Sequence, residues 1–174
     1  MMDLKPYIRE VPDWPIKGVN FKDITTLLQD YNLLKYVVDE MIEPFKEVKI
    51  DKIVAIDARG FLFATPIAYK IGCGVSLVRK EGKLPYKTIK ESYEKEYGLD
   101  VLAMHEDTIK KGEKVLVVDD LLATGGTIEA TIKMIERLGG EVVGASFVVD
   151  LPFLGGREKL AKYNLNCLVT YDEE

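Results

Sequence analysis

The chain has 174 residues, of which 47% are hydrophobic and 30% are charged, values typical of one folded domain rather than of a disordered chain. Its 24 basic and 29 acidic residues give a net charge of −5, which indicates no general attraction to nucleic acid or to an anionic membrane. The sequence contains no run of roughly twenty apolar residues, so no membrane-spanning helix is expected.

Cysteine usage and the start of the chain bear on its cellular compartment. Cys73 and Cys167 lie far apart, lack the spacing of metal ligands, and sit within apolar runs that predict buried thiols. The first ten residues, MMDLKPYIRE, lack the apolar segment of a signal peptide. We therefore expect a protein of the reducing cytoplasm.

In chain order, apolar runs of strand length alternate with stretches of helical periodicity. The predicted strands cover residues 52–56, 74–78, 114–118, 141–149 and 166–171. The predicted helices cover 34–45, 61–71 and 128–138, with a shorter one in 156–164. Most of these strands are apolar on both faces, which is typical of strands covered on both sides. This pattern predicts an α/β fold with a mainly parallel central sheet flanked by helices, whose ligands bind at the carboxyl ends of the strands.

Two segments fit neither pattern. They are residues 11–25, VPDWPIKGVNFKDIT, and residues 80–100, KEGKLPYKTIKESYEKEYGLD. Because long loops are uncommon in compact domains, we expect the second segment to be a functional loop.

The stretch VLVVDDLLATGGT, residues 115–127, places Asp119 and Asp120 at the end of a predicted strand. Residues 123–127 then lead into a helix, and a helix N-terminus favours an anion. Carboxylates accept hydrogen bonds from hydroxyl groups, so the two parts together suit a ribose 5-phosphate. The alternative is an ordinary strand followed by a capped helix. The chain contains no G-x-x-x-x-G-K-[ST] and no G-x-G-x-x-G nucleotide motif.

This stretch resembles the phosphoribosyl-pyrophosphate motif of the type I phosphoribosyltransferases. Other segments resemble the adenine-specific members of that family, in the same order along the chain: PDWPIKGVNFKDIT (12–25), AIDARGFLF (55–63), VRKEGKLP (78–85), ESYEKEYG (91–98) and GREKL (156–160). The likeness covers nearly the whole chain. It implies a single phosphoribosyltransferase domain over residues 1–174, with a base-binding hood at 1–30 and a flexible catalytic loop at 80–100.

The resemblance implies a purine-salvage reaction, in which ribose 5-phosphate is transferred from phosphoribosyl pyrophosphate to N9 of adenine, giving AMP and pyrophosphate. Positive charge develops on the ribose and negative charge on the leaving group, so a catalyst must stabilise both and exclude water. The resemblance also implies a homodimer, and Mg²⁺ held through substrate and water near Asp119 and Asp120.

The resemblance implies that Glu96, Arg59, Asp119 and Asp120 are the catalytic residues, and it assigns the site residues to parts of the substrate. The phosphate and ribose would be bound by Asp119, Asp120, Ala123, Thr124, Gly125, Gly126 and Thr127. The pyrophosphate would be bound by Asp57, Ala58, Arg59, Arg79, Lys80 and Lys83, with a non-proline cis peptide near Asp57 and Ala58. For the lysines, a solvated basic surface is the alternative.

Base recognition and proton transfer are assigned in the same way. Phe21 would stack on the purine while the backbone of Asn20 and Lys22 reads its edge. Family members usually carry an aliphatic residue where this chain has Asn20, so an Asn20 amide turned inward would affect selectivity. Within the 82–98 cover, Tyr93 and Tyr97 would bury their rings, and Tyr97 would also line the adenine site. Glu96 would take the N9 proton or assist a protonated ring. The alternative is a two-stranded ribbon with Glu96 exposed.

Two other functions remain open from the sequence. One is a phosphoribosyltransferase for hypoxanthine and guanine, xanthine or orotate. The other is a non-catalytic regulator that senses phosphoribosyl pyrophosphate, although such proteins usually add a DNA-binding domain or a basic surface.

Overall fold

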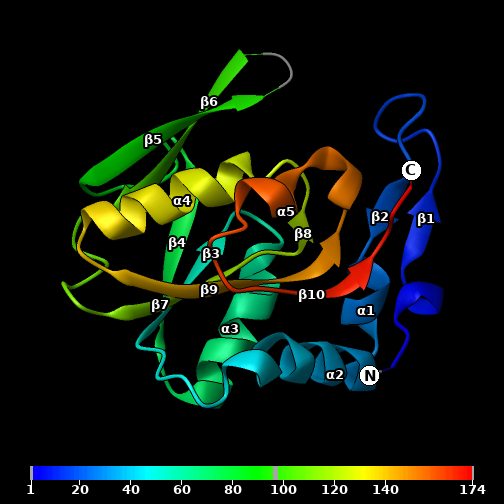
Figure 1. Cartoon of the computed structure of the whole chain (residues 1–174), viewed down its shortest axis with the longest axis horizontal. Coiled ribbons are helices and arrows are strands. Elements are labelled where there is room, and N and C mark those ends of the chain that lie inside the picture. Colours follow the sequence, from blue (N-terminus) through cyan, green and yellow to red (C-terminus); the bar gives the residue numbers. More distant parts are fainter. Residues whose placement is uncertain (1, 96–97, 174) are drawn as a thin grey trace.

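The computed structural model describes residues 2–95 and 98–173 (Figure 1). The strands are β1 (Arg9–Val11), β2 (Phe21–Asp23), β3 (Lys52–Ile56), β4 (Gly74–Lys80), β5 (Thr88–Lys95), β6 (Gly98–His105), β7 (Lys114–Val118), β8 (Leu121–Leu122), β9 (Glu141–Asp150) and β10 (Leu165–Thr170). The α-helices are α1 (Thr25–Gln29), α2 (Tyr31–Ile42), α3 (Gly60–Ile71), α4 (Gly126–Arg137) and α5 (Gly156–Lys159). Three short 3₁₀ helices are η1 (Lys5–Tyr7), η2 (Glu43–Phe45) and η3 (Pro152–Leu154).

Within these residues a sheet of eight strands runs in the order β10-β9-β7-β3-β4-β6-β5, with β8 paired to β9. The strands from β10 to β4 are parallel to their neighbours, whereas β6 and β5 are antiparallel. The α/β fold with a mainly parallel sheet is thus confirmed. The parallel strands bring their carboxyl ends to one edge, where residues 57–60 and 119–127 follow β3 and β7.

Side chains of the central strands alternate between two buried clusters, one on each face of the sheet. In β3, Ile53 and Ala55 belong to the cluster that includes residues of α2 and α3, whereas Val54 and Ile56 belong to the cluster that includes residues of α4. Figure 1 shows α4 and α3 on opposite sides of the sheet. Strands apolar on both faces therefore have a helical layer on each side, as their composition predicts.

Helix α2 is fixed at both ends by side chains. The Asp30 carboxylate accepts hydrogen bonds from the N–H groups of Asn32 and Leu33, at 2.8 and 2.9 Å, and so caps the first turn. At the other end the Met41 carbonyl accepts hydrogen bonds from Ser146 Oγ at 2.7 Å and from Asn166 Nδ2 at 3.3 Å. These contacts satisfy backbone groups that a helix end leaves open, and they join α2 to β9 and β10.

The expected loop at residues 80–100 is wrong in its secondary structure, because β5 and β6 form an antiparallel pair with Ile89 opposite Met104. Ile89 and Tyr93 pack against the α4-side cluster, while the alternating residues Lys90, Ser92 and Glu94 are exposed. Such a half-covered strand lacks the continuous apolar run that marks the central strands. Glu96 and Tyr97 lie outside the described residues.

Two further segments differ from expectation. Residues 11–25 contribute to a small antiparallel pair, with Val11 opposite Phe21, and lead into α1. The C-terminal helix is shorter than expected, since α5 ends at Lys159 and a turn follows.

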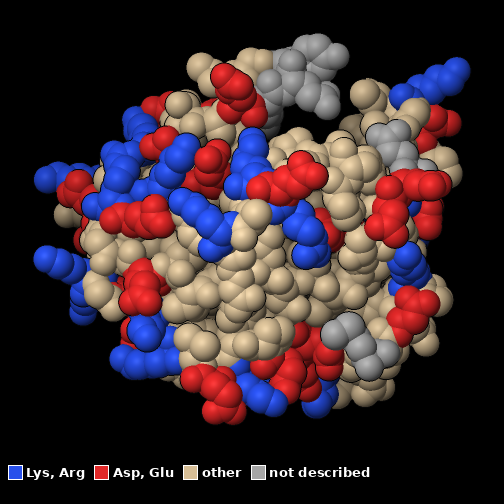
Figure 2. All heavy atoms as spheres, in the orientation of Figure 1, with Lys and Arg blue, Asp and Glu red and all other residues tan. Residues whose placement is uncertain are grey.

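The exterior carries charges of both signs. Figure 2 shows Lys and Arg intermingled with Asp and Glu on the face in view. Among the described helices, none combines the length and the apolar character needed to cross a membrane.

The α2 cap gives a direct test of the fold. We expect Asp30→Ala to lower the free energy of unfolding by about 1 kcal/mol, because two N–H groups lose their acceptor. Asp30→Asn keeps an oxygen acceptor and is expected to retain most of that stability. Urea denaturation of the three proteins measures the difference; equal stabilities of Asp30→Ala and the wild type would contradict the role of the cap.

Candidate functional site

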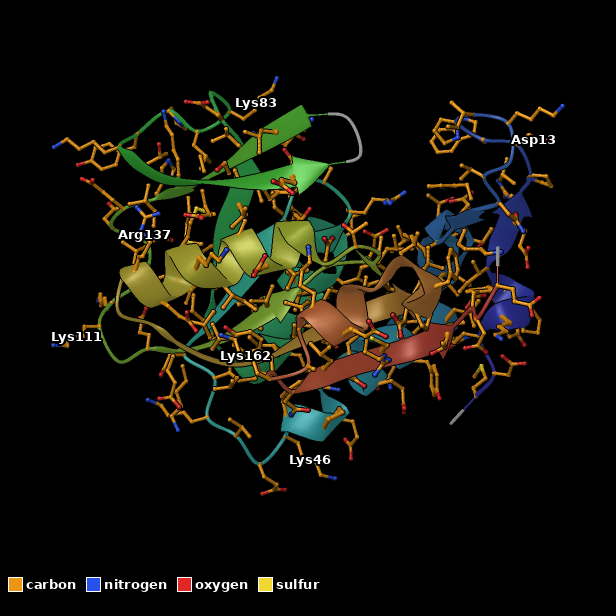
Figure 3. The ribbon with its side chains drawn as sticks, turned by 45° about the horizontal axis from the view of Figure 1, so that its top comes forward. Asp13, Lys46, Lys83, Lys111, Arg137 and Lys162 are labelled. Carbon is orange, nitrogen blue, oxygen red and sulfur yellow. The ribbon has the colours of Figure 1, made fainter. Side chains whose placement is uncertain are left out.

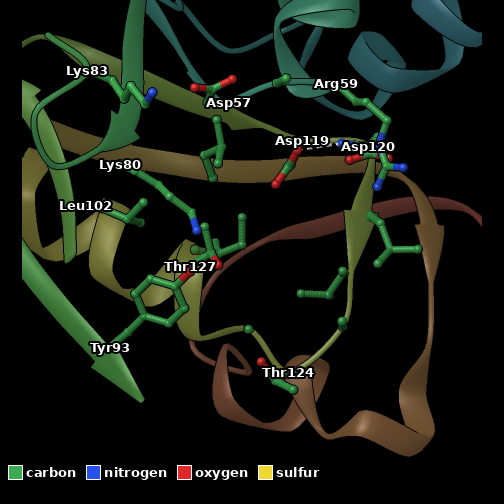
Figure 4. A pocket seen from close by; sticks show the side chains of 17 residues that line it. Asp57, Arg59, Lys80, Lys83, Tyr93, Leu102, Asp119, Asp120, Thr124 and Thr127 are labelled. Atoms are coloured by element: carbon green, nitrogen blue, oxygen red, sulfur yellow. Dashed lines mark hydrogen bonds and ion pairs between the residues drawn. The ribbon is translucent and has the colours of Figure 1, made fainter. Parts of the chain in front are cut away.

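A cavity of about 680 Å³ opens at the carboxyl ends of β3 and β7 (Figure 4). Its lining residues are Ile56, Asp57, Ala58, Arg59, Lys80, Lys83, Tyr93, Leu102, Asp119, Asp120, Leu121, Leu122, Ala123, Thr124, Gly125, Thr127 and Ile128. This volume lies in the range of roughly 300–1,000 Å³ that is typical of small-molecule sites. Figure 3 shows Lys83 beside the β5–β6 pair and Asp13 on the N-terminal segment, on opposite sides of the upper edge of the molecule.

Asp119 and Asp120 follow β7 directly and are held in different ways. Asp120 is 5% exposed, and its carboxylate forms an ion pair with Arg59, with 2.7 Å between Nε and Oδ2. Asp119 Oδ1 accepts a hydrogen bond from the Asp120 N–H at 2.9 Å. Burial raises the pKa of Asp119 well above the usual aspartate value, and the adjacent charge of Asp120 raises it further. Burial also raises the pKa of Asp120, although the charge of Arg59 opposes this shift.

The loop after the two acids exposes main-chain donors to the cavity. Gly125 precedes α4 with φ of 76°, in the left-handed region that favours glycine, and no side chain caps the helix. Among the described residues, none accepts a hydrogen bond from the main-chain N–H groups of residues 124–127. Donors of this kind at a helix N-terminus suit an anion. Figure 4 shows Thr124 and Thr127 across the cavity from Asp119 and Asp120.

Residues 57–59 follow β3 and form a second wall. The peptide bond between Asp57 and Ala58 is cis, as the resemblance implies. Helix α3 begins at Gly60, where an added Cβ would lie 2.9 Å from Asp119 Oδ1 and 3.0 Å from the Val118 carbonyl oxygen. A larger residue at this position would require Asp119 or the end of β7 to shift, so glycine suits the close approach of Arg59 and the end of β3 to the end of β7.

Cationic side chains occupy the side of the cavity nearest β4. Lys80 and Lys83 line it, and Lys80 Nζ lies 3.3 Å from Asp100 Oδ2. Arg79 does not line the cavity; its Nε lies 2.7 Å from Asp57 Oδ2, and its Nη1 donates to the Lys83 carbonyl at 3.2 Å. Arg79 therefore braces the 57–58 loop from behind.

The predicted base-binding residues lie beside the cavity rather than in its wall. The Phe21 ring centre is 5.2 Å from Arg59 Cζ and 4.4 Å from the Trp14 ring centre. Asn20 and Lys22 point to the opposite side of β2, where their side-chain nitrogens lie 2.5 and 2.9 Å from Glu10 Oε2. The hydrogen bond from Lys22, and then that from Asn20, lowers the pKa of Glu10. The Asn20 amide is thus held at the back of β2, and only the main chain at this position is left to read a base.

Sequence reasoning missed the apolar part of the lining. Ile56, Leu102, Leu121, Leu122 and Ile128 border the cavity, although each reads as a core residue in the sequence. Of these, only Leu121 could have been assigned to the site from the sequence, because it directly follows the paired acids. Gly126 lies just outside the lining, under the ring of Tyr93, whose Cδ2 would be 3.0 Å from an added Cβ. Glu96 and Tyr97 fall outside the described residues, so their assignments stay predictions.

Comparisons with known proteins agree with this geometry. Residues 25–168 match the model of the phosphoribosyl transferase domain. A protein of Clostridium botulinum (strain Loch Maree / Type A3) named adenine phosphoribosyltransferase is 56% identical over 171 residues, covering 98% of this chain and 99% of its own. One of the same name from Brachyspira hyodysenteriae is 56% identical over 170 residues, covering 98% of this chain and 100% of its own.

Solved structures are similar over almost the whole length. The adenine phosphoribosyltransferase of Rhodothermus marinus has a TM-score of 0.93 at 47% identity, covering 97% of this chain and 96% of its own. That of Saccharomyces cerevisiae, solved with an imino-altritol bisphosphate and adenine, has a TM-score of 0.90 at 38% identity, covering 95% of this chain and 96% of its own. The chain therefore belongs to the phosphoribosyltransferase family, among the adenine phosphoribosyltransferases.

Proposed function

We propose that this protein transfers ribose 5-phosphate from phosphoribosyl pyrophosphate to N9 of adenine, releasing pyrophosphate and AMP, in the cytoplasm. One observation carries the proposal: a single cavity joins the Asp119–Asp120 pair, the uncapped start of α4, and Arg59, Lys80 and Lys83. A sugar with a phosphate at one end and a pyrophosphate at the other presents charges and hydroxyl groups that match these three parts.

The two ends of a ribose 5-phosphate suit opposite sides of the cavity. The 5-phosphate accepts hydrogen bonds from the open N–H groups of residues 124–127, and Thr124 and Thr127 add hydroxyl donors. The ribose hydroxyls donate to the carboxylates of Asp119 and Asp120. The phosphate thus stays away from the acids that would repel it.

Charge separation in the reaction matches the charges of the walls. As the bond from C1 to the pyrophosphate oxygen breaks, the ribose ring becomes positive and the leaving group gains negative charge. Asp119 and Asp120 oppose the charge on the ring, and Arg59, Lys80 and Lys83 oppose the charge on the pyrophosphate. The new bond forms between C1 and N9, and the N9 proton passes to a base, for which Glu96 stays the predicted acceptor.

The purine would lie near Phe21, which contacts Arg59 at the border of the cavity. The yeast relative solved with adenine supports a base site in this fold. Adenine has a donor at N6 beside an acceptor at N1, and hypoxanthine reverses both, so a site formed by fixed main-chain groups discriminates between them. The predicted closure of the 80–100 segment would exclude water during the reaction.

Magnesium is proposed as the cofactor, held near Asp119 and Asp120 through oxygens of the substrate and of water, the ligands that it prefers. In the described parts of the chain no cluster of three or more His, Cys, Asp or Glu side chains could hold a metal. A magnesium ion near the acids would therefore take its ligands from the substrate and water, and would neutralise charge on the pyrophosphate when bound.

A homodimer is proposed from the resemblance and from exposed apolar side chains on one side of the molecule. Leu62 and Tyr69, which share a face of α3, are 49% and 91% exposed, and Leu77 on β4 is 40% exposed. Covering these side chains with a second copy would remove apolar surface from water. The interface would lie near Arg79 and the loop that carries Lys83.

The function is tested by incubating the protein with phosphoribosyl pyrophosphate, magnesium and one base at a time. We expect AMP from adenine, with hypoxanthine, guanine and orotate used at least about a hundredfold less well. Omitting magnesium and adding EDTA should abolish the product. A preference for another base would replace adenine as the substrate, and binding of phosphoribosyl pyrophosphate without any product would identify a non-catalytic sensor.

Asp119→Asn separates stability from activity. Because its pKa is raised in the fold, Asp119 makes the wild type less stable as pH rises above the unfolded aspartate value. The amide of the variant keeps an oxygen for the Asp120 N–H but carries no charge, so the variant's melting temperature should exceed that of the wild type at pH 8 and approach it at pH 4. Its kcat/KM should fall by about a hundredfold, since a charge opposing the ribose is lost.

The effect of Asp119 is measured from the melting temperatures of the wild type and Asp119→Asn between pH 4 and pH 8. Asp107→Asn, a substitution at an exposed aspartate, is the control. An Asp119→Asn protein less stable than the wild type at pH 8 would contradict the electrostatic account.

The dimer is tested by Tyr69→Glu, which places a charge in the proposed interface. Light scattering should give the wild type twice the mass of the 19.6 kDa chain and should shift the variant towards the monomer. Tyr31→Glu, at a tyrosine 75% exposed on α2, is the matched control and should stay dimeric. A dimeric Tyr69→Glu or a monomeric wild type would argue against this interface.

A further inference from the structure

Gly156 lies directly behind the loop that offers its N–H groups to the cavity. An added Cβ at Gly156 would be 2.2 Å from the Ala123 carbonyl oxygen and 3.0 Å from Gly125 N. In the other direction, a Cβ at Gly125 would be 3.1 Å from both Gly156 Cα and its carbonyl oxygen. We propose that Gly156 and Arg157 are positioning residues that fix the 123–127 loop in its anion-binding conformation, an inference that rests on the proposed function.

The contact is between two main chains, so it has little freedom to relax. A flexible side chain could move aside from an added methyl group, but the atoms at risk here are the backbone carbonyl of Ala123 and the backbone nitrogen of Gly125. Ordinary contacts of a Cβ lie at 3.4–4 Å, so one of the two segments would have to move by roughly 1 Å. Gly156 itself is buried and has no left-handed φ, so proximity is the reason for glycine there.

Arg157 holds the backing segment in place. Its Nε and Nη2 lie 2.8 and 2.7 Å from Asp150 Oδ2, and Asp150 is 0% exposed at the end of β9. Asp150 is also the register partner of Leu122 in β8, the strand that leads into the loop. Asp150 therefore contacts both β8, which enters the loop, and Arg157, which belongs to the segment behind the loop.

The arrangement connects a distant segment to phosphate binding. Gly156 and Arg157 do not line the cavity, yet a shift of Ala123 would turn the following peptide groups away from a bound phosphate. A misplacement of about 1 Å far from the reacting atoms can cost on the order of a hundredfold in activity. The phosphate end of the substrate should be affected first, because Phe21 and the base-binding side belong to other elements.

The experiment measures ribose 5-phosphate binding by calorimetry in the wild type, Gly156→Ala and Gly74→Ala. Gly156→Ala should raise the dissociation constant by about 10- to 100-fold. Gly74→Ala is the matched control and should bind as the wild type does, since its added Cβ would be 3.5 Å from the nearest atom, in the Lys52 side chain.

The KM for adenine at saturating phosphoribosyl pyrophosphate, and the melting temperature, separate positioning from general damage. In Gly156→Ala the KM for adenine should stay close to the wild-type value, and the melting temperature should fall only by the few degrees that such a buried clash costs. A merely structural defect would instead weaken the binding of adenine and of ribose 5-phosphate to a similar degree.

If Gly156→Ala does not fold, Arg157→Lys is used for the test. Lysine keeps a positive charge beside Asp150 but offers the carboxylate one nitrogen donor in place of two. A raised dissociation constant for ribose 5-phosphate supports the inference. Wild-type binding in a folded Gly156→Ala, or in Arg157→Lys if it alone folds, overturns it. The readout needs no turnover, so a wild type that binds ribose 5-phosphate but makes no AMP would refute the proposed function while leaving this inference tested.

Discussion

The ion pair between Arg59 and Asp120 joins the ends of β3 and β7, and the cavity is arranged around it. The guanidinium compensates a carboxylate that is nearly removed from water, and in low dielectric an unpaired charge at this place would be strongly destabilising. Next to the pair, α3 starts at Gly60, which lets the chain after β3 approach Asp119 closely. The two opposite charges thus meet where the ends of β3 and β7 come close together.

The remaining groups of the site are held in states that a stable fold would avoid. Asp119 adds a second acid to a place where burial already disfavours ionisation, and the first turn of α4 has no cap. These features cost stability, which the two buried clusters on the faces of the sheet offset. These unfavourable features lie where a phosphorylated sugar would supply the missing hydrogen-bond partners, and such a location is usual for binding sites.

Much of this arrangement can be predicted from sequence patterns, and there are physical reasons why the remaining features cannot. Residues 52–56 and 114–118 match β3 and β7 because a strand buried on both faces is a continuous apolar run with polar ends. The β5–β6 pair is not predicted as strands, because in β5 charged residues alternate with Ile89 and Tyr93 and only one face is covered. Asp57, Arg59, Lys80, Lys83 and the 119–127 motif, apart from Gly126, meet at one cavity as the resemblance implies. The contact of Gly156 with Ala123 has no local signal, since it depends on two segments packed by the tertiary fold.

The orientation of Asn20 bears on how substrate preference in such a protein is changed. Its amide lies on the reverse of β2 with Glu10 and Lys22, and Lys22 Nζ also lies 4.3 Å from the centre of the Tyr171 ring. Exchanging the side chain at this position would alter the support of the strand and, in the proposed base site, would leave the main-chain groups facing the purine unchanged. Redesign towards another nucleobase would accordingly have to redirect peptide units, by inserting or deleting residues or remodelling the turn at 12–19, and point replacements at Asn20 would leave selectivity largely where it is.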